Sequence, residues 1–145
     1  MTNKLLRSLV RIYDDIYSGS PYERLKVVSF LIYKGKIVNF GVNSEKTSPM
    51  QKFYRKKTSL ATIPNFIDKE HSEINLLRRT YFGEFDMRRV ELVVISKRND
   101  GSFRLARPCC TCMKAVKDFG IQNIYYTTNE NTIIKEEVQF ERKTN

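Results

Sequence analysis

The chain contains two short motifs, His71-Ser72-Glu73 and, further along, Pro108-Cys109-Cys110-Thr111-Cys112. Together the two stretches supply one imidazole, two thiols three residues apart, and a carboxylate two residues from the imidazole. A catalytic zinc ion takes three protein ligands and keeps its fourth position for water. The pattern therefore predicts a zinc site formed by His71, Cys109 and Cys112. It also predicts that Glu73 moves protons beside that site.

The composition is that of a globular protein. The chain has 145 residues, of which 41% are hydrophobic and 12% aromatic, so we expect residues 1–145 to form a single domain. No apolar run approaches the roughly 20 residues that span a bilayer. The first residues interrupt their apolar positions with charge, unlike a secretory signal. Three cysteines, two of them adjacent, make a poor disulfide framework, so we expect a cytoplasmic protein that does not associate with membranes.

The positive charge of the chain is concentrated in its first part. Residues 1–60 carry 12 Lys/Arg against 4 Asp/Glu, whereas residues 61–145 carry 14 against 12. The segment 45–68 lacks clear periodicity and contains Lys52-Phe53-Tyr54-Arg55-Lys56-Lys57. We interpret it as a long loop that either holds phosphate and stacks on a base or is a mobile surface segment. The overall charge suits a polyanionic partner or a phosphorylated substrate, but an ordinary solvated surface explains it equally well.

Hydrophobic periodicity predicts an α/β domain. An apolar stripe at Leu5, Leu9, Ile12 and Ile16 predicts a first helix. Two more helices are expected from about Lys69 to Phe82, capped by Asp68, and from Pro108 to Phe119, stopped by Gly120. Apolar and β-branched runs predict strands at Val27–Tyr33, Lys36–Val42, Val90–Ser96, Ile121–Thr127 and Thr132–Phe140. This order indicates a mixed sheet between layers of helices.

The predicted helices give the motif residues suitable positions. Cys109 and Cys112 would share one face of the first turn of a helix, where the helix dipole favours thiolate. Cys110 would point about 100° away, so we interpret it as a small buried filler. Three other interpretations stay open: a structural Cys₃His zinc site that includes Cys110, a thioredoxin-like redox pair, and a cysteine nucleophile working with His71.

The two motifs resemble those of the cytidine/deoxycytidylate deaminase superfamily, which also includes tRNA adenosine deaminases and polynucleotide cytidine deaminases. The resemblance spans roughly Val27 to Thr128. It implies a three-layer α/β/α sandwich with a mixed five-stranded sheet, and Zn²⁺ held between two helix N-termini. It further implies that Glu73 is the proton shuttle and that Asn43 holds the substrate sugar, although Gly41-Val42-Asn43 can also be an ordinary turn. The backbone at Arg107 and Pro108 would meet the amino group of the base.

The substrate follows less directly from this resemblance. The short tail Asn129–Asn145 favours a direct hairpin after the fourth strand, as in the free cytidine deaminase branch. We therefore expect a zinc-dependent hydrolase that converts the cytosine of a free nucleoside or nucleotide (cytidine/deoxycytidine or CMP/dCMP) to uracil and releases ammonia. The alternatives are a deaminase acting on a base in single-stranded DNA or RNA and a non-catalytic zinc-stabilised nucleic-acid-binding module. Assembly into a homo-oligomer is expected from the resemblance alone.

Overall fold

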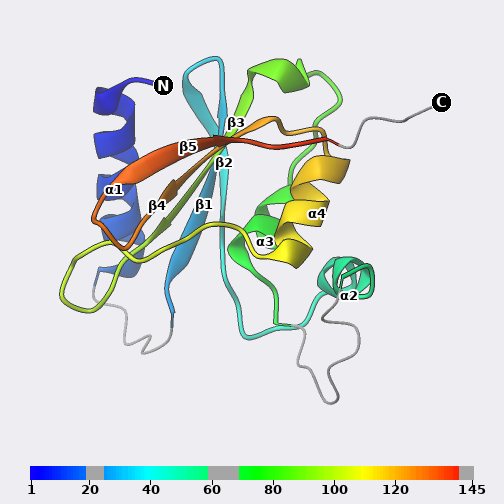
Figure 1. Ribbon diagram of the computed structural model, residues 1–145, viewed down its shortest axis with the longest axis horizontal. Coiled ribbons are helices and arrows are strands. Elements are labelled where there is room, and N and C mark those ends of the chain that lie inside the picture. The colour runs from blue at the N-terminus through cyan, green and yellow to red at the C-terminus, as the bar shows by residue number, and fades with distance from the viewer. Residues whose placement is uncertain (19–24, 59–68, 141–145) are drawn as a thin grey trace.

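A mixed sheet of five strands forms the centre of the computed structural model, which describes residues 1–18, 25–58 and 69–140 (Figure 1). The strand order is β2-β1-β3-β4-β5. The strands are β1 (Val27–Tyr33), β2 (Lys36–Val42), β3 (Val90–Ser96), β4 (Asn123–Thr127) and β5 (Ile133–Glu137). The helices are α1 (Asn3–Tyr17), α2 (Pro49–Arg55), α3 (Ser72–Arg78) and α4 (Cys110–Asp118), and a 3₁₀ turn, η2 (Met87–Arg89), precedes β3.

The pairing of the strands confirms the mixed sheet. β1 runs antiparallel to both β2 and β3, β3 runs parallel to β4, and β4 runs antiparallel to β5. The parallel pair needs a crossover, which α4 supplies, whereas β4 and β5 are joined by a direct hairpin as predicted. The expected α/β fold with a five-stranded sheet is therefore confirmed.

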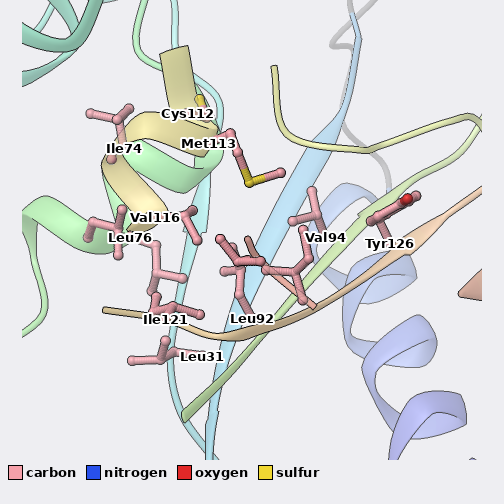
Figure 2. Packing of buried hydrophobic residues seen from close by; sticks show 14 of the residues in the cluster. Leu31, Ile74, Leu76, Leu92, Val94, Cys112, Met113, Val116, Ile121 and Tyr126 are labelled. Carbon is pink, nitrogen blue, oxygen red and sulfur yellow. The ribbon is translucent and has the colours of Figure 1, made fainter. Parts of the chain in front are cut away.

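The central strands of the sheet are buried on both faces, which gives the molecule two hydrophobic cores and three layers (Figure 1). Along β1, Val28 and Phe30 belong to the core under α1, while Leu31 belongs to the core on the opposite side. Figure 2 shows this second core, where side chains of α3 and α4 pack against the central strands. It includes Ile74, Leu76, Leu92, Val94, Met113 and Val116. The close packing of α3 and α4 on one face fixes the position of both motifs.

Helix α1 closes the other face of the sheet. The hydroxyl of Thr2 accepts a hydrogen bond from the amide of Leu5 and caps the helix. Leu9 and Tyr13 are buried, and the Tyr13 hydroxyl donates to the carbonyl of Lys26 at 2.9 Å. The predicted stripe is thus a plain packing face, as expected from its periodicity.

The prediction for the segment 45–68 was wrong in one respect. Part of it forms α2, which begins at Pro49 after the side chain of Ser48 caps the helix. A serine followed by proline is a helix-start signal, but α2 spans only seven residues and offers little periodicity. Residues 59–68, including the predicted cap Asp68, lie outside the described part of the chain.

The helices that carry the motifs are shorter than predicted. Lys69 forms a β-bridge with Thr47 instead of starting a helix, so α3 begins only at Ser72. At the other end, the hydroxyl of Thr80 donates to the carbonyl of Leu76 at 2.7 Å and helps to close the helix. Within the described residues, no helix is both long and apolar enough to cross a membrane.

Candidate metal centre

The first turns of α3 and α4 bring the three predicted ligands together. His71 is the N-cap of α3 and Cys109 the N-cap of α4, while Cys112 lies one turn into α4. The Nδ1 atom of His71 is 3.2 Å from the Sγ atom of Cys112 and 3.6 Å from the Sγ atom of Cys109. All three ligand atoms lie within 4.8 Å of one another. This His/Cys/Cys group could hold a metal ion.

The geometry fits tetrahedral zinc. Zn–S bonds of about 2.3 Å and Zn–N bonds of about 2.0 Å place tetrahedral ligand atoms about 3.5 to 3.8 Å apart. The distances from His71 Nδ1 to the two sulfur atoms, 3.2 and 3.6 Å, are close to that spacing. Two thiols and an imidazole are also the donor types that zinc prefers.

His71, Cys109 and Cys112 lie close enough to change one another's pKa values. A hydrogen bond with Cys112 lowers the pKa of Cys109 to about 4, and His71 contributes in the same direction. The same thiol–thiol contact, together with burial, raises the pKa of Cys112. Hydrogen bonding to Cys109 raises the pKa of His71 because it favours the imidazolium. The three side chains therefore shift one another's pKa values, and a bound cation would compete with protons for them.

Cys110 lies outside this group. Its side chain is exposed. Among the described residues, the group that could hold a metal ion contains only His71, Cys109 and Cys112. The prediction that it is not a ligand agrees with this arrangement, but the prediction that it fills the core was wrong. Because Cys109 is the cap and Cys110 the first helical residue, the side chain of Cys110 projects outward.

A cavity of about 350 Å³ opens beside the cluster. Glu73, which is only 5% exposed, lines this cavity together with His71 and Cys109. Its Oε1 atom accepts a hydrogen bond from the Ser72 hydroxyl at 2.6 Å. The other lining residues are Leu25, Val27, Asn43, Ser44, Glu45, Lys69, Glu70, Ser72, Leu105, Ala106 and Arg107. A carboxylate, the ligand cluster and a partly apolar cavity thus converge at one place.

Two buried polar residues, Gln51 and Glu70, stabilise the backbone at the start of α3, and neither was predicted from the sequence. The side-chain oxygen of Gln51, from α2, accepts a hydrogen bond from the backbone amide of His71 at 3.0 Å. Glu70 is buried and accepts a two-pronged interaction from Arg78, with N···O distances of 2.9 Å. Burial raises the pKa of Glu70, but hydrogen bonds from Arg78, Asn75 and Ser48 outweigh it and hold that pKa at about 2.

Gly41 lets α3 lie against the sheet. A Cβ atom at this position would stand 2.5 Å from the carbonyl oxygen of Ser72 and 2.6 Å from the amide nitrogen of Leu76. Only glycine accommodates such a close approach of a helix backbone to a strand. The strand β2 therefore helps to set the depth at which the first turn of α3 sits.

Asn43 lies on the wall of the cavity, but its side chain is largely engaged in the fold. Its Oδ1 atom accepts from the amide of Val27 at 2.9 Å and from the hydroxyl of Tyr17 at 3.2 Å. Its Nδ2 atom donates to the carbonyl of Leu25 at 2.6 Å. Within the described residues the second N–H of this amide has no partner, so a sugar contact is compatible with a structural role at the end of β2.

The basic segment 52–57 is not part of this cavity. Among the described residues, the cavity lining includes none of its side chains. Lys57 instead lies over the ring of Phe53, with its Nζ atom 4.1 Å from the ring centroid. Arg107 does line the cavity, and its guanidinium forms a two-pronged ion pair with Glu136 of β5 at 2.9 and 3.0 Å.

Solved structures with the same fold are deaminases. A cytidine deaminase from Burkholderia pseudomallei superposes with a TM-score of 0.57 and 15% identity, covering 95% of this chain and 94% of that chain. A dCMP deaminase from the cyanophage S-TIM5, in complex with dCMP and dUMP, gives 0.55 and 18%, covering 88% and 84%. Its apo form gives 0.54 and 18%, covering 88% and 86%. No protein-family model and no curated protein sequence matches the chain.

The fold of this chain is therefore that of the cytidine and deoxycytidylate deaminases, and the resemblance inferred from the two motifs is confirmed at the level of the fold. Identities of 15% and 18% do not carry the activity of those enzymes over to this chain.

Proposed function

We propose that the protein is a zinc-dependent hydrolase that deaminates the cytosine of a free nucleoside or nucleotide. The observation that supports this most strongly is that the buried Glu73 lines one cavity with His71 and Cys109, two members of the cluster that Cys112 completes. A redox pair of Cys109 and Cys112 gives no role to His71 or Glu73. A Cys₃His site would need Cys110, which projects away from the cluster.

In the proposed reaction, three residues would bind zinc and Glu73 transfers protons. Zinc held by His71, Cys109 and Cys112 would supply a water molecule of lowered pKa at its open position. Glu73 takes a proton from the attacking water and delivers it to the ring nitrogen beside the amino-bearing carbon. It then takes the second proton of that water, now bonded through its oxygen to the ring carbon, and delivers it to the departing amine as the C–N bond breaks and the carbonyl forms. Water and cytosine give uracil and ammonia, so no further reactant is needed.

The cavity suits a base attached to a sugar. Its volume of about 350 Å³ lies at the small end of the range for small-molecule sites. Apolar side chains at its mouth, Leu25 and Leu105, are 46% and 52% exposed and offer surface for a flat base. The remaining N–H of Asn43 would donate to a sugar hydroxyl.

Three free thiols suit a reducing cytoplasm, where we place the protein as one domain over residues 1–145.

One observation favours the rival substrate, a cytosine in single-stranded DNA or RNA. A second cavity of about 480 Å³ lies next to the first, and Arg107 lines both. Its lining includes Lys114 and Lys117 of α4 and Phe140, which is 45% exposed. Cations beside an exposed aromatic ring are typical of surfaces that bind single strands. A flanking nucleotide could therefore continue from the first cavity into the second.

A substrate panel tests these assignments. We expect zinc-loaded protein to release ammonia from cytidine, deoxycytidine, CMP or dCMP faster than from any adenine compound or from short cytosine-containing oligonucleotides. Deamination of the oligonucleotides alone, with loss of activity in Lys114→Ala/Lys117→Ala, would replace this proposal by the polynucleotide one. Oligonucleotide binding with a steep salt dependence and no ammonia from any substrate would indicate a non-catalytic binding module.

A further inference from the structure

The first turn of α3 contains a buried hydroxyl network that the proposed reaction has not used. Ser29 is a hydroxyl residue within the otherwise apolar stretch Val27–Ile32 of β1, and it is fully buried. Its neighbours Val28 and Phe30 face the core under α1, so Ser29 faces the opposite layer, where α3 lies. Ser72, between the two motif residues His71 and Glu73, is also fully buried.

These two hydroxyls form a short chain that ends on the carboxylate. The Oγ atoms of Ser29 and Ser72 are 2.7 Å apart. The Ser72 hydroxyl donates to Oε1 of Glu73 at 2.6 Å, and the Ser29 hydroxyl lies 3.4 Å from the same oxygen. Among the described residues, neither hydroxyl has a hydrogen bond to any other group. The position of Ser29 opposite Gly41 in the sheet brings the strand and the helix close enough for this contact.

The direction of the hydrogen bonds follows from the proton count. The Ser72 hydroxyl donates to Oε1, so its proton is engaged there, and the Ser29 proton points to Ser72 or to Oε1. A buried hydroxyl without a partner disfavours folding, and alanine would fill either position without that requirement. The two serines are thus matched to the carboxyl group of Glu73 rather than to packing.

We propose that Ser72 and Ser29 are positioning residues that anchor Oε1 of Glu73 and leave Oε2 as the oxygen that carries the proton. This inference rests on the proposed deaminase function. In the first transfer an O–H bond of the attacking water breaks and an Oε2–H bond forms. That bond then breaks as the proton moves to the ring nitrogen. With Oε1 held by Ser72, the carboxylate cannot rotate away between the two transfers, so both occur at one atom.

Serine-to-alanine variants test the anchor through the split between kcat and KM. Ser72→Ala should lower kcat about 10- to 100-fold, the range expected for losing a hydrogen bond to a charged group, with KM changed less than about twofold. Ser29→Ala should act in the same direction but less, because Ser29 reaches Glu73 mainly through Ser72. The double variant should be no slower than Ser72→Ala, since the two hydroxyls act in series. Zinc content should equal that of the unmodified protein.

Ser96→Ala is the matched control. Ser96 is a buried serine on β3 whose hydroxyl donates to the carbonyl of Lys26 at 2.8 Å, away from Glu73. Ser72→Thr, which keeps the hydroxyl, should restore part of the lost kcat. The proposal is overturned if Ser72→Ala keeps its kcat, or if Ser96→Ala lowers kcat to the same extent.

A second readout does not depend on turnover. In the unmodified chain Ser72→Ala removes a donor from a buried carboxylate, and it should lower the denaturant midpoint of unfolding. In a Glu73→Ala background the same substitution should shift that midpoint less, because the hydrogen bond from Ser72 to the Glu73 carboxylate is already absent. Equal shifts of the midpoint in the two backgrounds would overturn the proposal that Ser72 holds Oε1 of Glu73. Unequal shifts in a protein that deaminates no substrate would support the anchor and reject the function.

Discussion

Alanine at Gly41 would push α3 away from the sheet. An added Cβ would stand 2.5 Å from the Ser72 carbonyl oxygen, 2.6 Å from the Leu76 nitrogen and 2.9 Å from the Leu76 Cα, whereas ordinary contacts begin at 3.4 Å. All three neighbours are backbone atoms, so no flexible side chain can yield. The backbone of the first turn of α3 has to retreat by roughly 0.9 Å to reach an ordinary contact distance.

That retreat exceeds what the metal centre tolerates. Metal–ligand distances in working sites stay within about 0.2 Å of their ideal values, and His71 immediately precedes the displaced residue. We therefore expect Gly41→Ala to weaken zinc binding about 10- to 100-fold, as the loss of a supporting contact does in other zinc sites. Overpacking should also lower the free energy of unfolding by about 1–3 kcal/mol.

Gly35→Ala separates the two effects. Gly35 occupies the β1–β2 turn at φ +78°, and nothing lies within 4 Å of a Cβ added there. Alanine in this conformation costs about 1–2 kcal/mol, but it touches no part of α3. Zinc affinity, measured by competition with a chromophoric chelator, should fall in Gly41→Ala and stay unchanged in Gly35→Ala. Equal zinc affinities in the two variants would refute the argument that Gly41 sets the depth of α3.

Three further outcomes follow from the site. The pKa of Glu70 is held at about 2 against an ordinary 4.5, so its ion pair should contribute at most about 3 kcal/mol above pH 4.5 and lose that contribution as the pH falls towards 2. The difference in unfolding free energy between unmodified protein and Glu70→Gln should accordingly shrink between about pH 5 and pH 2; a constant difference would contradict it. Cys110→Ser should keep one zinc per chain, whereas Cys112→Ser should lose it, as elemental analysis would show. Gln51→Ala should weaken zinc binding about 10-fold, and an unchanged affinity would remove Gln51 from the support of His71.

The sequence was sufficient to predict the sheet and the ligand cluster. Each strand has an apolar, β-branched run bounded by turn residues, so periodicity alone located β1, β2 and β3 correctly. The proximity of His71, Cys109 and Cys112 could be predicted because chemistry restricts the spacing of candidate zinc ligands. The placement of both motifs at helix starts also agrees with the fold, in which His71 and Cys109 are the N-caps of α3 and α4.

The remaining features depend on contacts between segments distant in sequence. Gly41 has an ordinary local conformation, and its importance lies in how closely Ser72 approaches it. Gln51 reaches His71 from a helix too short to show periodicity. The exposure of Cys110 follows from a helix start two residues later than predicted. Hydrogen bonds such as Ser29 to Ser72 join positions 43 residues apart and leave no local pattern.

The assignment of Glu73 as the proton carrier beside a three-ligand zinc site is tested most directly by the rate of ammonia release from the best cytosine substrate, compared between zinc-loaded protein and zinc-loaded Glu73→Gln. Glutamine keeps the shape of the side chain, so zinc content should stay at one ion per chain. The rate should fall by about 10²- to 10⁴-fold, the range for losing a general acid/base. An undiminished rate in Glu73→Gln, at equal zinc content, would contradict the proposed chemistry.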